Sequence, residues 1–243
     1  MIYVSTHAGK RHSISEDAVL IGTDVLSDVS DVLPVPDAGF ICVADGVGGN
    51  LGGAEASHFV LNAMAECKDI LCEDLKAFML KINDELIASA SKDGKAPNMA
   101  TTLTGIFLND NIKHLVHVGN TRAYIKQGRY LKQITSDHTT YNWLMSIGQI
   151  EAAKRCNKNE ITSCFGGHDS TLLSKLQISD CQDFNLAILT SDGIHEYVDI
   201  DSLEEIISGG GSYAEKCEAI RQKAIEAGSE DDLSVVIILP SEG

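Results

Sequence analysis

Three aspartates stand at the ends of apolar runs in this sequence. Asp45 ends the run FICVAD and is followed by Gly46. Asp192 ends the run LAILTSD, and Asp231 comes just before the apolar run LSVVIIL. Carboxylates at strand ends lie at the rim of a core, and two of them within a few Å repel each other by several kcal/mol at an effective dielectric constant of about 20. A divalent cation between such carboxylates would relieve the repulsion.

The residue types also indicate which cation would fit. Mg²⁺ and Mn²⁺ prefer oxygen ligands, and the glycine after an aspartate lets the backbone come close enough for a carbonyl oxygen to be a ligand as well. Glu16 and Asp17 form a further acidic position, immediately before the apolar run Ala18–Ile21. Asp-Gly is also a common turn pair, so the spacing alone leaves a purely structural interpretation open.

The composition excludes several kinds of partner. The 243 residues include 19 Lys and Arg against 35 Asp and Glu, a net charge of −16, which repels nucleic acid and anionic membranes. An acidic surface suits cation binding, although many acidic proteins bind no metal. Seven cysteines without a CxxC pair favour a reducing compartment. Because the N-terminus lacks a signal-peptide pattern, we expect a cytoplasmic protein.

Apolar periodicity predicts many strands and three long helices in one domain spanning residues 1–243. The runs between residues 101 and 135 are separated by short turns and predict a four-stranded antiparallel meander. Antiparallel sheet with segregated helices is therefore expected. The predicted strands are Ala18–Thr23, Phe40–Ala44, Thr101–Leu108, Lys113–Val118, Arg122–Lys126, Arg129–Thr135, Thr171–Ile178, Asn185–Thr190 and Leu233–Leu239, and the predicted helices are Ala54–Lys68, Cys72–Ser91 and Tyr213–Ala227.

Seven segments, taken in order, resemble the metal-dependent serine/threonine protein phosphatases of the PPM, or type 2C, family. The likeness covers nearly the whole chain and is that of a bacterial-type single-domain member. The resemblance implies a fold of the α+β class, a four-layer α-β-β-α sandwich in which paired helices flank two central antiparallel sheets. The segments are THAGKRHSISED, VADGVGGNLGGAEAS, NMATTLTGIFL, HVGNTRAYIKQGRYLKQITSDHT, SIGQIEAAKRCNKNEITSCFGG, LTSDGIHE and EDDLSVVII.

The resemblance also implies a centre of two Mn²⁺ or Mg²⁺ ions, whose bridging water attacks phosphorus without a covalent phospho-enzyme. By position, Asp45 would bridge both ions and the carbonyl of Gly46 would bind one of them. Asp192 and Asp231 would bind the other ion. The family's acidic pair, which contacts or orients the metal centre, falls on Glu16 and Asp17.

The sequence departs from the family pattern at several positions. The usual phosphate-binding arginine falls on His12, and we expect the neighbouring Arg11 to take its place, since a guanidinium binds phosphate better than an imidazole. Asn120 stands where an aspartate often serves a third metal, which puts that ion in doubt. Asp232 replaces the usual asparagine. Val47 stands where some members carry a histidine that acts as general acid, so water would protonate the leaving oxygen.

The predicted function is hydrolysis of phosphoserine and phosphothreonine in signalling proteins, the substrates of a serine/threonine kinase, by a monomeric enzyme. Two alternatives remain open: a pseudophosphatase that binds phosphoproteins with little or no turnover, and a metal-dependent phosphohydrolase of small molecules on the same scaffold. The segment Thr140–Cys164 resembles the family's flap, and we expect its tryptophan, Trp143, to be anchored against the core, with contact to a substrate or partner as the alternative.

Overall fold

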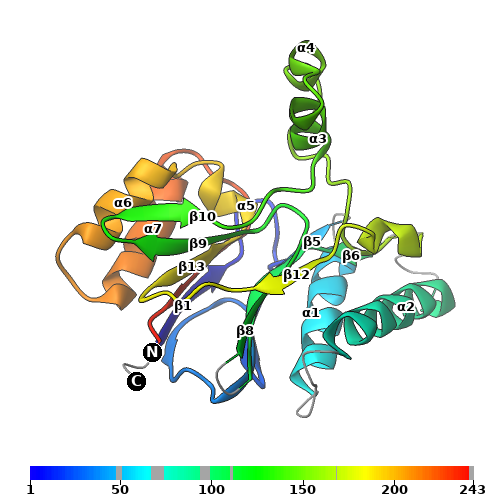
Figure 1. The fold of residues 1–243 in the computed structure, drawn as a ribbon, viewed down its shortest axis with the longest axis horizontal. Coiled ribbons are helices and arrows are strands. Elements are labelled where there is room, and N and C mark those ends of the chain that lie inside the picture. Colours follow the sequence, from blue (N-terminus) through cyan, green and yellow to red (C-terminus); the bar gives the residue numbers. More distant parts are fainter. Residues whose placement is uncertain (48–50, 67–73, 94–98, 110–111, 168, 241–243) are drawn as a thin grey trace.

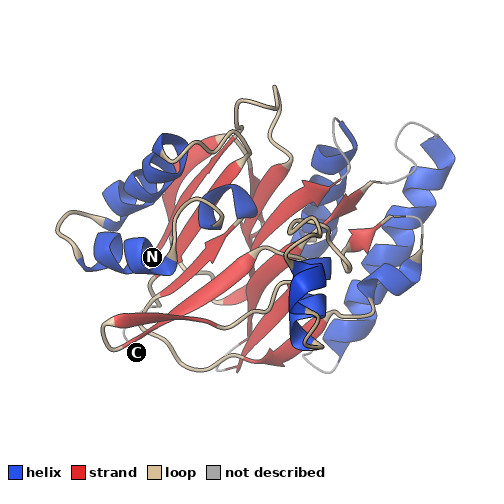
Figure 2. Ribbon diagram, turned by 90° about the horizontal axis from the view of Figure 1, so that it is seen from above, coloured by secondary structure: helices blue, strands red, loops and turns tan. Residues whose placement is uncertain are grey.

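The computed structural model describes residues 1–47, 51–66, 74–93, 99–109, 112–167 and 169–240. Two antiparallel sheets lie at the centre, and helices cover both outer faces (Figures 1 and 2). The predicted α+β class and four-layer α-β-β-α order are therefore confirmed. No helix in these described ranges is both long and apolar enough to cross a bilayer.

The first sheet has six strands in the order β10-β9-β13-β14-β1-β4. Its outer face is covered by α6 and α7. Helix α7 begins at a capping box, in which the Ser212 and Glu215 side chains each bond the other's backbone N–H. The bounds are β1 (Ile2–His7), β4 (Val29–Leu33), β9 (Arg122–Gln127), β10 (Tyr130–Gln133), β13 (Ala187–Thr190), β14 (Leu233–Ile238), α6 (Ile200–Ser208) and α7 (Tyr213–Glu226).

The second sheet has eight strands, six of them in the order β11-β6-β5-β7-β8-β12, with β2 pairing with β5 and β3 pairing with β2. Helices α1 and α2 pack on its outer face. The bounds are β2 (Asp17–Gly22), β3 (Asp24–Leu26), β5 (Ala38–Val47), β6 (Ala100–Thr101), β7 (Leu103–Asn109), β8 (Ile112–Val118), β11 (Phe165–Gly166), β12 (Gln177–Asp180), α1 (Leu51–Ala65) and α2 (Leu75–Asp93).

The layer order explains why the central strands read as continuous apolar runs. In β2, Ala18 and Leu20 point to the helices while Val19 and Ile21 point to the opposite sheet. Successive side chains of a strand alternate between its faces, so a strand covered on both faces must be apolar at every position. The same arrangement holds β5, whose end carries Asp45.

The meander prediction is wrong at its middle turn, although β9 and β10 pair antiparallel as expected. Strands β7 and β8 pair as expected, but β8 and β9 belong to different sheets, so the Gly119-Asn120 turn is a crossover between the sheets. Gly119 has a φ of 106°, and a Cβ there would lie 2.5 Å from the Thr102 side chain. A glycine is therefore required where the chain changes sheets. The crossover delivers Asn120 to the strand ends that carry the acidic residues.

The strand predicted over Thr171–Ile178 is also wrong in its first half. The structure has a 3₁₀ helix, η2 (Ser170–Leu173), and the strand β12 starts only at Gln177. The Asp169 carboxylate accepts the Thr171 N–H and starts the helical turn. The segment predicted as one strand therefore begins as a 3₁₀ helix and ends as a strand, because Asp169 caps its first turn.

Two short helices, α3 (Thr140–Ser146) and α4 (Ile150–Ala153), project from the sandwich (Figure 1). The predicted anchoring of Trp143 is wrong, because this residue of α3 is 52% exposed.

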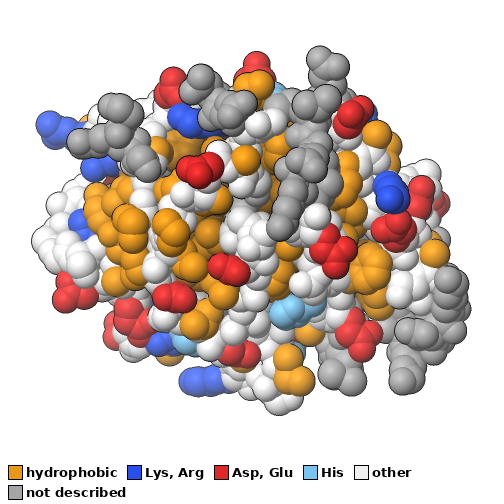
Figure 3. Space-filling view, turned by 90° about the horizontal axis from the view of Figure 1, so that it is seen from below, with side chains coloured by type: hydrophobic (Ala, Val, Ile, Leu, Met, Phe, Trp, Pro, Cys, Tyr) orange, Lys and Arg blue, Asp and Glu red, His pale blue; other side chains and the backbone are white. Residues whose placement is uncertain are grey.

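On the face shown in Figure 3, acidic side chains are spread among hydrophobic and neutral ones. The negative charge on that face is therefore distributed and does not form a single patch.

Candidate functional site

The predicted aspartates come from four separate segments and meet at one end of the sandwich. Asp17, the first residue of β2, pairs directly with Asp45 in β5. Asp192 opens the short helix α5 (Asp192–His195) directly after β13, and Asp231 precedes β14. The charges of Asp17, Asp192 and Asp231 all act on Asp45, and a side-chain hydrogen bond joins Asp45 to Asp192. The structure thus brings together the acidic residues that the sequence singled out.

This grouping changes the acidity of the carboxyl groups. Burial, followed by the negative charges of neighbouring aspartates, raises the pKa of Asp45 well above the usual range of a carboxyl group. Burial likewise raises the pKa of Asp17, although hydrogen bonds from Ser191 and Ser234 partly oppose the shift. Burial and the charge of Asp231 raise the pKa of Asp192 to about 6. Such shifts show that the cluster carries more negative charge than its surroundings compensate.

Buried oxygen atoms without a hydrogen-bond partner give a test of whether a cation fits here. They include Glu16 Oε1, Asp17 Oδ2 and Asn120 Oδ1. An unsatisfied buried acceptor costs about 1–3 kcal/mol, so three together favour a hydrogen-bond donor or a cation between them. All are oxygen donors, the type that Mg²⁺ and Mn²⁺ prefer, and these ions keep several waters as further ligands. The residues present fit a centre of hard divalent cations.

The carboxyl groups are nevertheless not arranged as a closed cage. Among the described residues, no three acidic, histidine or cysteine side chains are spaced as ligands of one ion. Asp45 and Asp192 are instead hydrogen-bonded to each other. The assignment of individual ligands, including Gly46, therefore stays a prediction.

Gly46 and Gly53, both in the segment VADGVGGNLGGAEAS, allow close packing around the acidic residues. A Cβ on Gly46 would lie 2.2 Å from the carbonyl oxygen of Gly53, and a Cβ on Gly53 would lie 2.6 Å from the carboxyl carbon of Glu16. The start of α1 thus packs directly on the end of β5 and on the Glu16 side chain. Gly48 and Gly49 of the motif lie outside the described residues.

Arg11 and His12 point to different carboxylates. The Arg11 Nη1 lies 3.3 Å from Asp231 Oδ2, with the side chain 55% exposed. The His12 Nδ1 lies 3.0 Å from Asp232 Oδ2, and its Nε2 lies 3.9 Å from Glu16 Oε2. Arg11 therefore stands at the rim of the aspartate cluster, while His12 is turned towards the buried Asp232.

Asn120 both belongs to the crossover turn and enters the site. Its Nδ2 donates to Asp192 Oδ2 at 2.9 Å.

Two serines that contact the cluster were not predicted from the sequence. The side chains of Ser191 and Ser234 form hydrogen bonds with Asp17. The only signal for Ser191 was its place directly before Asp192. Ser234 carried none, since its position in β14 is known only from the pairing of strands.

A cleft of about 430 Å³ opens beside the aspartates, between the start of the α3 segment and α5. The Arg122 guanidinium binds both oxygens of Asp137 in its wall, at distances from 2.6 to 3.1 Å. The lining residues are Asn120, Arg122, Asp137, Thr139, Tyr141, Asn142, Lys158, Asn159, His195 and Glu196.

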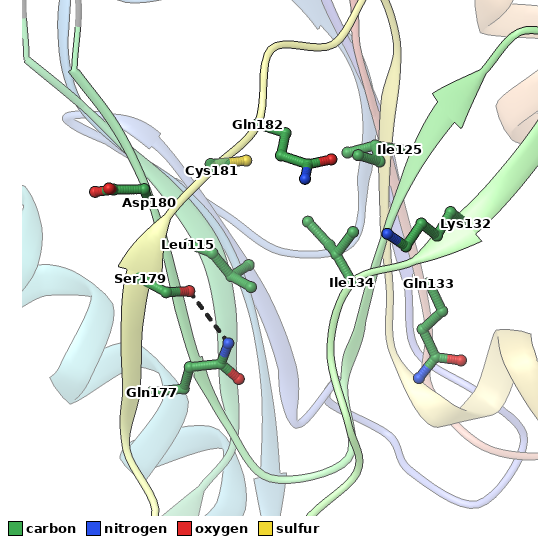
Figure 4. Close-up of a pocket in the computed structure, with 10 residues that line it drawn as sticks. All are labelled: Leu115, Ile125, Lys132, Gln133, Ile134, Gln177, Ser179, Asp180, Cys181 and Gln182. Carbon is green, nitrogen blue, oxygen red and sulfur yellow. Dashed lines mark hydrogen bonds between the residues drawn. The ribbon is translucent and has the colours of Figure 1, made fainter.

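A second cleft of about 240 Å³ lies between β12 and β10, with Leu115, Ile125 and Ile134 among its lining residues (Figure 4). The Gln177 amide donates to the Ser179 hydroxyl on its β12 wall. Asn120, which donates to Asp192, lines the larger cleft, whereas the described residues that line this cleft include neither a predicted site residue nor a residue bonded to one. The candidate site is therefore the aspartate cluster with the larger cleft beside it.

Comparison with known proteins agrees with this geometry. No family model matches the chain. The serine/threonine phosphatase stp of Listeria monocytogenes is 26% identical over 214 residues, which cover 82% of this chain and 83% of the relative. The crystal structure of serine/threonine phosphatase Stp1 from Staphylococcus aureus superposes with a TM-score of 0.81 at 25% identity and covers 100% of this chain and 95% of that one. The chain is similar to bacterial serine/threonine phosphatases in sequence and over its whole fold.

A second structure of this phosphatase family gives the same result. PstP/Ppp of Mycobacterium tuberculosis superposes with a TM-score of 0.79 at 25% identity and covers 98% of this chain and 97% of that chain. The family likeness therefore extends over the whole sandwich, including the strand ends that carry Asp17, Asp45, Asp192 and Asp231.

Proposed function

We propose that this chain hydrolyses phosphoserine and phosphothreonine in proteins by means of a metal-activated water at a centre of two Mn²⁺ or Mg²⁺ ions. The observation that supports this most directly is the set of unpartnered, buried oxygen atoms on Glu16, Asp17 and Asn120 beside Asp45 and Asp192. Oxygen donors with excess negative charge are what hard divalent cations require.

The side chains divide the work as follows. Asp45, Asp192 and Asp231 would hold the ions, together with the carbonyl of Gly46 and the acidic pair Glu16 and Asp17. When bound, the two ions supply a water of lowered pKa and positive charge for the phosphoryl oxygens. Arg11 has its guanidinium at the rim beside Asp231, where it can bind phosphoryl oxygens by two parallel hydrogen bonds. The leaving serine or threonine oxygen takes its proton from water.

The proposal extends to the organisation of the protein. Residues 1–243 act as one catalytic domain and as a monomer, and the substrates are phosphoproteins made by a serine/threonine kinase. Two ions are sufficient in this proposal, since the Asn120 amide oxygen is a neutral and weaker ligand for a third.

The test is Mn²⁺-dependent release of phosphate from a phosphothreonine peptide, compared with free phosphorylated metabolites. We expect Asp45→Asn and Asp192→Asn to lower kcat/KM by at least about 10³-fold, because each removes a carboxylate from the metal centre. Asp183→Asn serves as the control, since Asp183 is exposed and bound to Lys113 far from the cluster. Full activity in either cluster variant would refute the proposal, and preference for metabolites would correct the substrate class.

A pseudophosphatase is the second candidate, and two contacts favour it. The Asn120 amide is bonded to Asp192, and the Arg11 guanidinium is engaged with Asp231 and Glu230. Binding of a phosphothreonine peptide in the presence of Mn²⁺ without any phosphate release would support this candidate over the enzyme.

A further inference from the structure

Asp232 is a buried carboxylate beside the site, and its hydrogen bonds with described residues involve two backbone N–H groups and the His12 ring. It is 4% exposed. Its Oδ1 accepts the Gly9 N–H at 2.8 Å, and its Oδ2 accepts the Glu16 N–H at 2.6 Å. The His12 Nδ1 lies 3.0 Å from the same Oδ2. One side chain thus fastens the whole segment 9–16 to the end of β14.

His12 continues this connection to the Glu16 side chain. With Nδ1 turned to Asp232, the other ring nitrogen, Nε2, lies 3.9 Å from Glu16 Oε2. On its other side the Glu16 carboxyl group packs on Gly53, where a Cβ would come within 2.6 Å. The Glu16 Oε1 is left buried and without a partner. Glu16 is therefore held at its backbone by Asp232, and the His12 ring lies beside its carboxylate, with Nε2 3.9 Å from Oε2.

We infer that Asp232 and His12 form a positioning pair that fixes the Glu16 carboxylate for the metal centre. This inference rests on the proposed function, because it gives the pair a role in that centre. Groups that hold metal ligands in place typically affect metal affinity or activity by about 10- to 100-fold when they are replaced.

The donor pattern explains why an acid suits position 232. A carboxylate only accepts hydrogen bonds, and all three groups that face it here are donors. An asparagine would have to place its NH₂ group against either the Gly9 N–H or the Glu16 N–H. Asp232→Asn is therefore disruptive although it preserves the shape of the side chain.

Substitutions at His12 separate the two contacts of the ring. The amide nitrogen of asparagine can take the place of Nδ1, so His12→Asn keeps a donor for Asp232 and loses the contact with Glu16. The longer glutamine reaches the place of Nε2, so His12→Gln keeps the contact with Glu16 and loses the bond to Asp232. Both variants break the connection, each at a different link.

The experiment is a Mn²⁺ titration in which electron paramagnetic resonance reports free Mn²⁺, with kcat and KM for a phosphothreonine peptide measured in parallel. We expect Asp232→Asn, His12→Asn and His12→Gln each to weaken Mn²⁺ binding by about 10-fold or more. The double variant Asp232→Asn/His12→Gln should be within about twofold of Asp232→Asn alone, since the residues act as one unit. Raising the Mn²⁺ concentration in proportion should restore the activity of the variants, which it would not do for a damaged fold.

His114→Gln is the matched control, because His114 also faces an aspartate, with its Nδ1 3.2 Å from Asp180, but at the far strand β12. It should bind Mn²⁺ like the wild type. If His12→Asn also binds Mn²⁺ like the wild type, Asp232 merely packs the loop and the inference is wrong. This holds even if Asp232→Asn does not fold. A wild-type protein that binds Mn²⁺ but releases no phosphate would refute the proposed function and leave the positioning pair intact.

Discussion

At the scale of single residues, the site is governed by uncompensated negative charge. Asp17, Asp45 and Asp192 have a raised pKa because burial removes water from carboxyl groups that also repel one another. A group whose pKa is higher in the folded than in the unfolded protein adds stability only where it is protonated. That contribution is complete below the unfolded pKa and is lost as the pH rises through the folded pKa.

Asp192→Asn should therefore stabilise the metal-free protein at neutral pH. The carboxyl group of Asp192 has a folded pKa of about 6 against an ordinary value of 3.8, so the stability falls as the pH rises from about 4 to 6 and stays at the lower level above pH 6. In EDTA at pH 7.5 we expect the variant to unfold with a free energy higher by about 1–3 kcal/mol, and the difference to shrink as the pH falls to 4. Urea denaturation at both pH values measures it, and a variant less stable than the wild type at pH 7.5 would contradict the charge argument.

At the scale of elements, the site depends on turns and strand ends that are fastened to one another. The Gly119-Asn120 crossover joins the two sheets, and β9 follows it directly. Arg122, at the start of β9, binds the Asp137 carboxylate just before the segment that leads to α3. The Asn142 amide donates to the Asp137 carbonyl oxygen, which links the same contact to α3 itself. The wall of the larger cleft is thus set by one charged pair.

Arg122→Lys should weaken the contact with Asp137 in the cleft wall, although the substitution keeps the positive charge. Lysine cannot make the two parallel hydrogen bonds of the guanidinium to Asp137, whose side chain is 9% exposed. We expect a loss of about 1–3 kcal/mol in the free energy of unfolding and a higher KM for a phosphopeptide. Lys113→Met is the comparison, because the partner of Lys113, Asp183, is 96% exposed and such a pair contributes at most about 1 kcal/mol. Equal losses of unfolding free energy in the two variants would show that the paired hydrogen bonds of the Arg122 guanidinium do not contribute to stability.

At the scale of the whole molecule, a net charge of −16 and a buried acidic cluster should make stability depend on divalent cations. Ions that bind only the folded protein raise its stability with concentration, by about 2.7 kcal/mol at 100 times the dissociation constant. The acidic residues come from both sheets, so a bound ion would connect the two halves of the sandwich.

Mn²⁺ should accordingly raise the melting temperature of the wild type, and the increase should be largely lost in Asp192→Asn. Differential scanning calorimetry with and without Mn²⁺ at constant ionic strength measures the effect. Constant ionic strength matters because salt alone screens the general repulsion of an acidic protein. Equal increases in the two proteins would show that Mn²⁺ acts on the surface charge and not on the cluster.

The sequence by itself determined antiparallel sheet with segregated helices, most of the strands and the acidic positions, because apolar period and strand-end aspartates are local features. The four-layer sandwich was expected only from the family resemblance. It did not determine that β8 and β9 lie in different sheets, that Trp143 is exposed, or that the first half of Thr171–Ile178 is helical. Only the tertiary structure decided that Asp232 faces three N–H donors and that Ser234 bonds Asp17. Contacts between residues more than 200 positions apart follow from how layers pack, and no local pattern in the chain records them.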